Sequence, residues 1–152
     1  MLNKFTIQKS FAISAGAGSG KTYTLSRRYI NAILGFDFFR DKGFEDIYFE
    51  NLKSATTKQI VTITYTEAAA LEMKERIFGL ISKILSISDL DDSDNDKKSI
   101  LDAFSVLNSE QKSCVTKTLQ QALVQSSDAK ISTIHSFCLD ILKTNADIAK
   151  FD

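Results

Sequence analysis

Proline and tryptophan are absent from this 152-residue sequence, which also has only one histidine and two cysteines. Cys114 and Cys138 stand far apart, so we expect neither a disulfide framework nor a zinc site of the usual ligand spacing. Long apolar runs are missing too, since none approaches the roughly 20 residues that span a bilayer. We therefore expect a protein without structural metal and without a membrane segment, in the reducing cytoplasm.

The sequence has no excess of either charge, because nineteen Lys and Arg balance nineteen Asp and Glu. Net charge therefore identifies no nucleic-acid or membrane partner, and local motifs must do so. A hydrophobic content of 43% with 25% charged residues is typical of one globular domain with a sizeable core.

The N-terminal part of the chain has the pattern of strand, loop and helix. Residues 11–15 form a short apolar run, as in a buried strand, and residues 21–34 keep helical spacing. Gly35 is expected to end this helix, and Arg27 and Arg28 are expected to reach solvent. The face expected to pack on a sheet consists of Leu25, Tyr29, Ala32 and Ile33.

The loop between that strand and that helix has the composition of a phosphate-binding loop. Its residues are Ala15, Gly16, Ala17, Gly18, Ser19, Gly20, Lys21 and Thr22, followed by Tyr23. Glycines let successive backbone N–H groups converge on phosphate oxygens, and the helix N-terminus adds partial positive charge. Lys21 is expected to reach the β- and γ-phosphates of ATP, and the Thr22 hydroxyl to bind Mg²⁺. Ala15 replaces the first glycine of the strict pattern, but the context disfavours a simple Gly/Ser turn.

A second strand and helix follow in the middle of the chain. Residues 60–65 are β-branched and aromatic, which predicts a strand buried in a parallel sheet. Thr66 is the expected N-cap of a helix from Glu67 to about Ser86, in which Glu72 and Arg76 form an (i, i+4) pair. The apolar face of this helix is expected to be Leu71, Ile77, Phe78, Ile81 and Ile84 or Leu85.

Two segments lack a clear period. Residues 36–58 mix charges with aromatics, which predicts a partly helical connection. Its aromatics beside Arg40 and Lys42 could bind nucleic acid, but a flap packed over the domain edge is the favoured alternative. These aromatics are Phe36, Phe38, Phe39, Phe44, Tyr48 and Phe49. Residues 89–96 are rich in aspartate and predict a solvated loop, since they lack the glycine and closing glutamate of a calcium-binding EF-hand.

The C-terminal half completes an α/β pattern. Residues 97–124 predict two short helices, residues 130–134 a third strand, and Ser136 to about Ala149 a final helix. Long crossovers between strands favour a parallel sheet with helices on both faces. We expect core segments 1–86 and 129–152, with a helical insertion at about 87–128.

Two later segments sharpen the interpretation. Residues 62–73, T-I-T-Y-T-E-A-A-A-L-E-M, resemble the T-F-T-[NE]-x-A-A-x-E-[ML] segment of superfamily 1A DNA helicases. Residues 131–138, I-S-T-I-H-S-F-C, resemble the later T-[IF]-H-[SG]-F-C segment of that family. Glu67 and the wording of the second segment are closer to the RecB/AddA helicase-nuclease branch than to UvrD/Rep.

The resemblance implies the N-terminal part of a RecA-like P-loop ATP-binding domain, incomplete at its C-terminus. The activity it implies is that of an ATP-dependent DNA helicase in repair or recombination, with ATP and Mg²⁺ as cofactors. Its partners would be single-stranded DNA or DNA ends and a second helicase-nuclease subunit. The strand-contacting residues it implies are Thr64, Tyr65, Thr66, His135 and Ser136.

Each of these positions also has an ordinary structural interpretation. Taken alone, Tyr65 is more often a core aromatic, and His135 more often a helix-capping or buried histidine. Tyr23 stands where many relatives have an arginine, and Gln8 lies too close to the loop to be assigned to adenine recognition.

Part of the chemistry of hydrolysis is missing from these residues. ATP hydrolysis needs an acidic pair at the end of a buried strand, and usually an arginine at the transition state. No hydrophobic run here ends in such a pair. We therefore expect a fragment that binds nucleotide weakly and turns it over negligibly. The alternatives are a small P-loop phosphotransferase, disfavoured by the lack of an arginine-rich lid, and a non-catalytic nucleotide-binding module.

Overall fold

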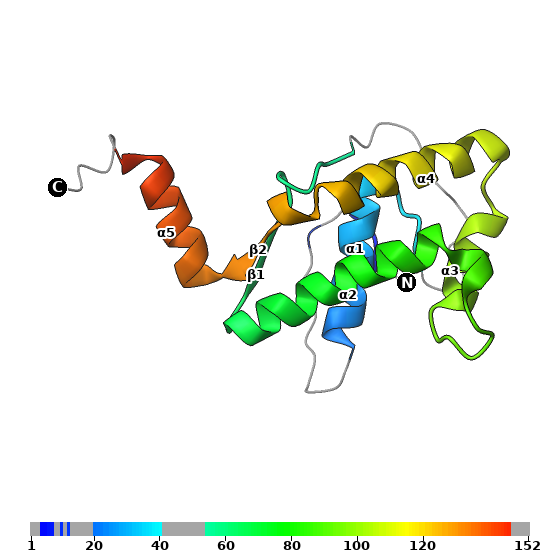
Figure 1. Cartoon of the computed structure of the whole chain (residues 1–152), viewed down its shortest axis with the longest axis horizontal. Helices are drawn as coiled ribbons and strands as arrows, with labels where there is room; N and C mark the ends of the chain where they lie inside the picture. The colour runs from blue at the N-terminus through cyan, green and yellow to red at the C-terminus, as the bar shows by residue number, and fades with distance from the viewer. Residues whose placement is uncertain (1–3, 8–9, 11, 13–19, 41–53, 147–152) are drawn as a thin grey trace.

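The structure, a computed structural model, describes residues 4–7, 10, 12, 20–40 and 54–146, and shows an α/β chain. Two parallel strands and five α-helices are present in those ranges (Figure 1). Helix α1 spans Lys21–Leu34, strand β1 Val61–Thr64, helix α2 Glu67–Leu85, helix α3 Lys97–Ser105, helix α4 Ser109–Val124, strand β2 Lys130–Thr133 and helix α5 Ile134–Thr144. The short 3-10 helices η1, Ile87–Asp89, and η2, Ser126–Asp128, follow α2 and α4.

Strands β1 and β2 pair in parallel, in a register that sets Val61 against Lys130 and Thr64 against Thr133. This confirms two of the three predicted strands, each shorter than expected, whereas the strand predicted at 11–15 lies outside the described residues. The prediction of a fully buried strand is wrong for β1, because Val61 and Ile63 are 42% and 45% exposed. Within the described sheet, β1 has a partner on one side only.

The hydrophobic core lies mainly between helices, and Ile131 of β2 packs against it. Helix α2 packs on α1 and on α4, and the three form the body of the molecule, with α5 beyond the sheet at the opposite end (Figure 1). Ile30, Ile77 and Leu119, one from each of these helices, are completely buried. Each such side chain contributes roughly 1.5–3 kcal/mol when removed from water. The predicted insertion is therefore part of the core, because α4 covers both α1 and α2.

The helices begin and end where local hydrogen bonding allows. Thr66 caps α2 by accepting a hydrogen bond from the Ala69 N–H, and Gly35 ends α1 in the left-handed conformation with φ 77°, both as predicted. Thr133 caps α5, which therefore begins two residues before the predicted Ser136. Helices α3 and α4 confirm the two helices predicted over residues 97–124, although α4, with 16 residues, is longer than expected. A capping box at Asn108 and a buried apolar face stabilise α4 over this length.

The aromatic segment after α1 packs inward. Phe36, Phe38 and Phe39 are all buried, which confirms the packed alternative for these three rings. The side chain of Asn31 on α1 holds this segment, because it accepts from the Phe39 N–H at 2.9 Å and donates to the Phe39 and Phe5 carbonyls. The remaining aromatics, Phe44, Tyr48 and Phe49, lie outside the described residues. Residues 36–40 and 54–58 contain no helix, and the rest of the connection predicted to be partly helical lies outside the described residues.

Helix α1 buries Tyr29 and Ile33 of the predicted apolar face, but two of its other residues lie opposite to expectation. Leu25, expected on the sheet, is 45% exposed, whereas Arg27, expected in solvent, is 2% exposed. The Arg27 guanidinium lies 3.4 Å from the centre of the Tyr23 ring and donates to Asp96 at 2.7 Å. Polar residues that have interaction partners thus occupy buried positions of α1. Leu71 of α2 was likewise expected on a buried apolar face, but it is 60% exposed.

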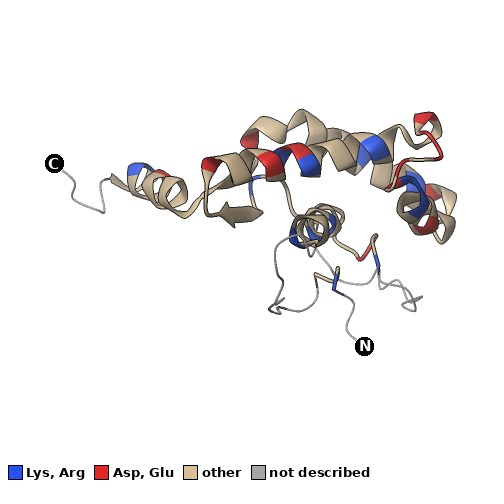
Figure 2. Ribbon diagram, turned by 90° about the horizontal axis from the view of Figure 1, so that it is seen from below, with Lys and Arg blue, Asp and Glu red and all other residues tan. Residues whose placement is uncertain are grey.

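Ion pairs attach the aspartate-rich loop to the helices at the end of the molecule opposite α5 (Figure 2). Lys83 of α2 bridges Asp94 and Asp96 at 2.9 Å each, and Lys97 pairs with Asp92 at 2.7 Å. The prediction of a solvated loop is therefore wrong for Asp94 and Asp96, whose side chains are each 21% exposed. Within the described ranges, no cluster of three or more potential ligands is placed to hold a metal ion, and no helix has the length and apolarity to cross a bilayer.

Asp96 stabilises the fold as an anion. Burial disfavours its charge, but hydrogen bonds from Lys83 and Arg27 outweigh that effect and lower its pKa. Because the pKa in the folded state lies below the unfolded value of about 3.9, ionisation of Asp96 stabilises the protein above that pH. This contribution is lost as the pH falls below about 4, through the pKa of the folded state.

We predict that Asp96→Asn lowers the free energy of unfolding at pH 7 by about 2 kcal/mol, since it leaves the buried Arg27 without a carboxylate partner. The difference from the wild type should shrink below about pH 4. Chemical denaturation at pH 7 and at acid pH measures both effects. Asp92→Asn is the matched control, because that side chain is 98% exposed and should change stability little. Equal stability of the wild type and Asp96→Asn at pH 7 would contradict the assignment.

Candidate nucleotide and nucleic-acid site

The residue that leads into α1 has the backbone conformation expected of a phosphate-binding loop. Gly20 adopts φ 81°, in the left-handed region that favours glycine, and its carbonyl accepts from the Thr24 N–H at 2.9 Å. A Cβ at this position would meet nothing closer than 3.9 Å, so the conformation, and not a lack of space, requires the glycine. The earlier loop residues, Ala15, Gly16, Ala17, Gly18 and Ser19, lie outside the described residues.

The first turn of α1 has no side-chain cap. In contrast to α2, α4 and α5, which are capped by Thr66, Asn108 and Thr133, the N-cap of α1 is a glycine without a side-chain hydrogen bond. Backbone N–H groups at a helix start need acceptors, and phosphate oxygens can supply them. Lys21 and Thr22, predicted to contact phosphate and Mg²⁺, occupy this first turn. Their contacts with phosphate and Mg²⁺ remain a prediction.

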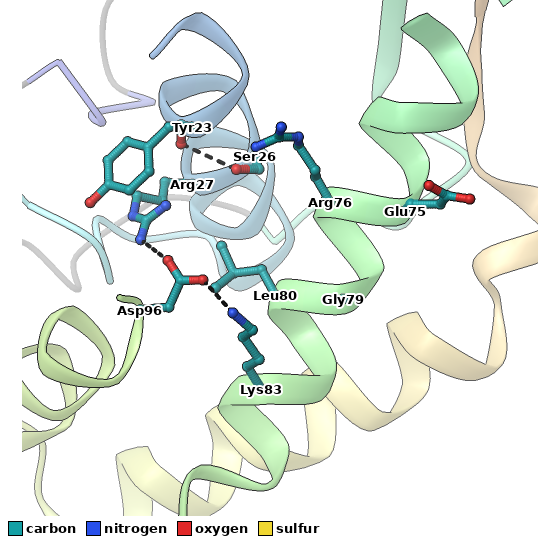
Figure 3. Close-up of a pocket in the computed structure, with 9 residues that line it drawn as sticks. All are labelled: Tyr23, Ser26, Arg27, Glu75, Arg76, Gly79, Leu80, Lys83 and Asp96. Carbon is teal, nitrogen blue, oxygen red and sulfur yellow. Dashed lines mark hydrogen bonds and ion pairs between the residues drawn. The ribbon is translucent and has the colours of Figure 1, made fainter. Parts of the chain in front are cut away.

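Tyr23 lies beside a cavity between α1 and α2. The cavity has a volume of about 340 Å³ (Figure 3). The lining residues include Tyr23, Ser26, Arg27, Arg76, Lys83 and Asp96. Figure 3 shows Arg27 and Lys83 both directed at Asp96. One face of the Tyr23 ring is stacked on Arg27, while the side chain is 42% exposed.

The two helicase-like segments meet at one edge of the sheet. Because β1 and β2 are parallel and Thr64 pairs with Thr133, both segments leave their strands at the same edge and continue directly into helices. Thr64 Oγ1 donates to the Thr66 carbonyl at 3.1 Å, and Thr66 Oγ1 accepts from the Ala69 N–H at 3.1 Å. Hydroxyls and first-turn amides from two separate segments are thereby brought to one edge.

The exposure of the aromatic residues at this edge decides between the interpretations of Tyr65 and His135. Tyr65 is 91% exposed, because its strand ends just before it, so the alternative interpretation as a core aromatic is wrong. His135 is exposed in the first turn of α5, and the cap there is Thr133, so neither a buried nor a capping histidine is present. Both rings are accessible to a ligand that lies along this edge.

The carboxylate of Glu67 connects the two segments, and sequence patterns did not predict this contact. Glu67 Oε1, at the start of α2, accepts from Thr133 Oγ1 and from Ser136 Oγ, each at 2.9 Å. The two hydroxyl oxygens are 3.0 Å apart, and Thr133 Oγ1 also accepts from the Ser136 N–H. The only signal for this role was Glu67 itself, which the sequence showed as a marker of the RecB/AddA branch.

Comparison with known proteins agrees with these motifs. Residues 3–152 match the UvrD/REP helicase N-terminal domain. The chain belongs to this family. It is 34% identical over 148 residues to an ATP-dependent helicase/nuclease subunit of Clostridium botulinum (strain Hall), and 30% identical over 141 residues to the protein of the same name from Clostridium kluyveri.

These relatives are much longer proteins. The matched regions cover 97% and 93% of this chain but 8% of each relative. The corresponding helicase/nuclease protein of Ligilactobacillus salivarius is similar to the same extent, with 33% identity over 135 residues, or 89% of this chain and 8% of the relative. The resemblance to UvrD/RecB-type helicases is thus confirmed, including that to the helicase-nuclease branch.

We predict that Thr133→Val destabilises the fold by about 1 kcal/mol, because it removes the cap of α5 while conserving side-chain volume. Thermal unfolding followed by circular dichroism measures the change. Thr116→Val is the matched control, since that hydroxyl bonds only to the Lys112 carbonyl within α4 and should matter little. Equal losses in the two variants would refute a specific capping role.

Proposed function

We propose that this chain is the N-terminal part of the ATP-binding domain of a longer, ATP-dependent DNA helicase that acts in DNA repair or recombination. The observation that carries the proposal is the meeting of two helicase-like segments, distant in sequence, at one edge of a parallel sheet. Membership of the UvrD/REP helicase N-terminal domain family and the helicase/nuclease names of the relatives support it.

The proposed nucleotide site is the loop 15–22, in a RecA-like P-loop fold with core segments 1–86 and 129–152. Lys21 and the backbone amides of the first turn of α1 would hold the phosphates of ATP, and Thr22 would bind Mg²⁺. Tyr23, which is 42% exposed, lies one residue farther along α1 and completes the proposed nucleotide contacts. When bound, Mg²⁺ would neutralise charge on the β- and γ-phosphates.

The proposed DNA site is the edge of the sheet where β1 and β2 end. Hydroxyls and backbone amides there can hold a phosphate, and an exposed aromatic can stack a base. Of the predicted DNA contacts, Thr64, Tyr65 and Thr66 come from the first segment and His135 from the second. Ser136, the remaining predicted contact, lies beside them and donates its hydroxyl proton to Glu67.

Single-stranded DNA or a DNA end is the proposed ligand of this edge. The relatives are named as subunits, which supports a second protein chain as a further partner. The cytoplasm, where bacterial DNA is accessible, is the proposed location.

We predict that Lys21→Ala weakens binding of Mg-ATP by about tenfold to a hundredfold, because a charge-assisted contact to phosphate is lost. Isothermal titration calorimetry measures the affinity. Lys117→Ala, an exposed lysine on α4, is the matched control and should bind as the wild type does. Unchanged affinity in Lys21→Ala would remove the basis for the nucleotide site.

For the DNA site, we predict that Tyr65→Ala in the complete protein weakens binding of single-stranded DNA by about fivefold to a hundredfold, the usual range for one stacked base. Stability should not change, since the ring is 91% exposed. Fluorescence anisotropy with a labelled oligonucleotide measures the affinity, and Tyr65→Phe, which keeps the ring, should bind normally. A Tyr65→Ala protein that binds DNA like the wild type would contradict the proposed edge.

A further inference from the structure

Three oxygen atoms form a closed triangle at the proposed DNA edge. Glu67 Oε1 is 2.9 Å from Thr133 Oγ1 and 2.9 Å from Ser136 Oγ, and the two hydroxyls are 3.0 Å from each other. Thr133 is buried, whereas Glu67 and Ser136 are exposed. The triangle therefore has one side that a ligand cannot reach and one side that faces the edge.

The number of protons in this triangle limits what Ser136 can do. An ionised carboxylate only accepts hydrogen bonds, and each hydroxyl carries one proton. The Thr133 oxygen already accepts from the Ser136 N–H, and its single proton can be donated to Glu67 Oε1 or to Ser136 Oγ. The strongest available bond for the Ser136 proton is the charge-assisted one to Glu67. Phosphate oxygens also only accept, so Ser136 cannot donate to Glu67 and to a DNA phosphate at the same time.

We propose that Glu67 is a positioning residue of the DNA edge, which directs the hydroxyl proton of Ser136 away from the nucleic acid and joins the start of α2 to the first turn of α5. This inference rests on the proposed function of that edge. DNA contact then depends on the other residues of the edge, which are Thr64, Tyr65, Thr66 and His135. Ser136 acts as a structural link between the two segments instead of a phosphate donor.

The charge of Glu67 has a second effect at this edge. A carboxylate in the first turn of α2 interacts favourably with that helix N-terminus, but it repels nearby phosphate groups. It therefore limits how closely the backbone of a bound strand approaches α5. The DNA edge therefore binds the strand more weakly with the Glu67 carboxylate present than it would with its hydroxyls alone.

The test is a double-mutant cycle in the complete helicase, read out as affinity for a single-stranded oligonucleotide. Ser136→Ala alone should change the affinity by less than about twofold, because its proton is already used by Glu67. Glu67→Ala should bind about threefold or more tightly at low salt, since it frees that proton and removes a repulsive charge. In the Glu67→Ala background, Ser136→Ala should then weaken binding by about threefold or more.

Glu67→Gln separates charge from hydrogen bonding. The amide oxygen can still accept from both hydroxyls, so the triangle is retained without its negative charge. This variant should bind DNA more tightly than the wild type at low salt, and its advantage should decrease as salt is added. A merely structural role for Glu67 would give no salt-dependent gain of this kind.

Two outcomes would overturn the inference. One is a weaker affinity in both Glu67 variants, and the other is an equal effect of Ser136→Ala with and without Glu67. Tyr65→Ala, measured in parallel, distinguishes the two proposals. If Tyr65→Ala weakens DNA binding while the Glu67 cycle shows no coupling, only the role of Glu67 is wrong. If Tyr65→Ala has no effect, the DNA edge itself is wrong.

Discussion

Parallel pairing of β1 with β2 is the constraint on which the candidate site depends. The register that sets Thr64 against Thr133 brings the ends of two strands to the same edge, although a helical segment of the chain separates them. Parallel strands require such a crossover, and here α2, α3 and α4 supply it. A slip of one residue would turn every side chain of a strand to the opposite face and separate the hydroxyls from Glu67. The geometry of the edge is therefore a direct result of sheet pairing.

The helical body supports that pairing through an interior that is partly polar. Asn31 satisfies backbone groups of the aromatic segment, and Arg27 is stacked between two rings while it donates to Asp96. Buried polar groups are tolerated where their hydrogen bonds are satisfied, and they favour one arrangement over others. In this protein they hold α1 in place against the segments on either side. The start of α1, where the proposed phosphate contacts lie, is thereby attached to the core.

The features of the fold and of the site that could be predicted from the sequence are those set by residues close together in the chain. Helix limits set by a single cap, such as Thr66 and Gly35, were predicted correctly, because the interaction involves neighbours in sequence. The burial of Arg27 was not, because its partner Asp96 is distant in sequence and hydrophobic spacing assigns an arginine to the surface. Tyr65 has the residue type of a core position, and only the end of β1 just before it leaves it exposed. For the candidate site, motif wording indicated which residues to consider, but the contact of Glu67 with Thr133 and Ser136 depends on the register of two strands, which no local pattern encodes.

The two ion pairs of Asp96 constrain the helices that supply its partners. Its carboxylate accepts from Arg27 on α1 and from Lys83 on α2, and Arg27 is in turn stacked against Tyr23. A displacement of α1 relative to α2 would have to break at least one of these charge-assisted bonds. Together with the packing of α2 on α1, the carboxylate of Asp96 therefore favours one relative placement of the two helices.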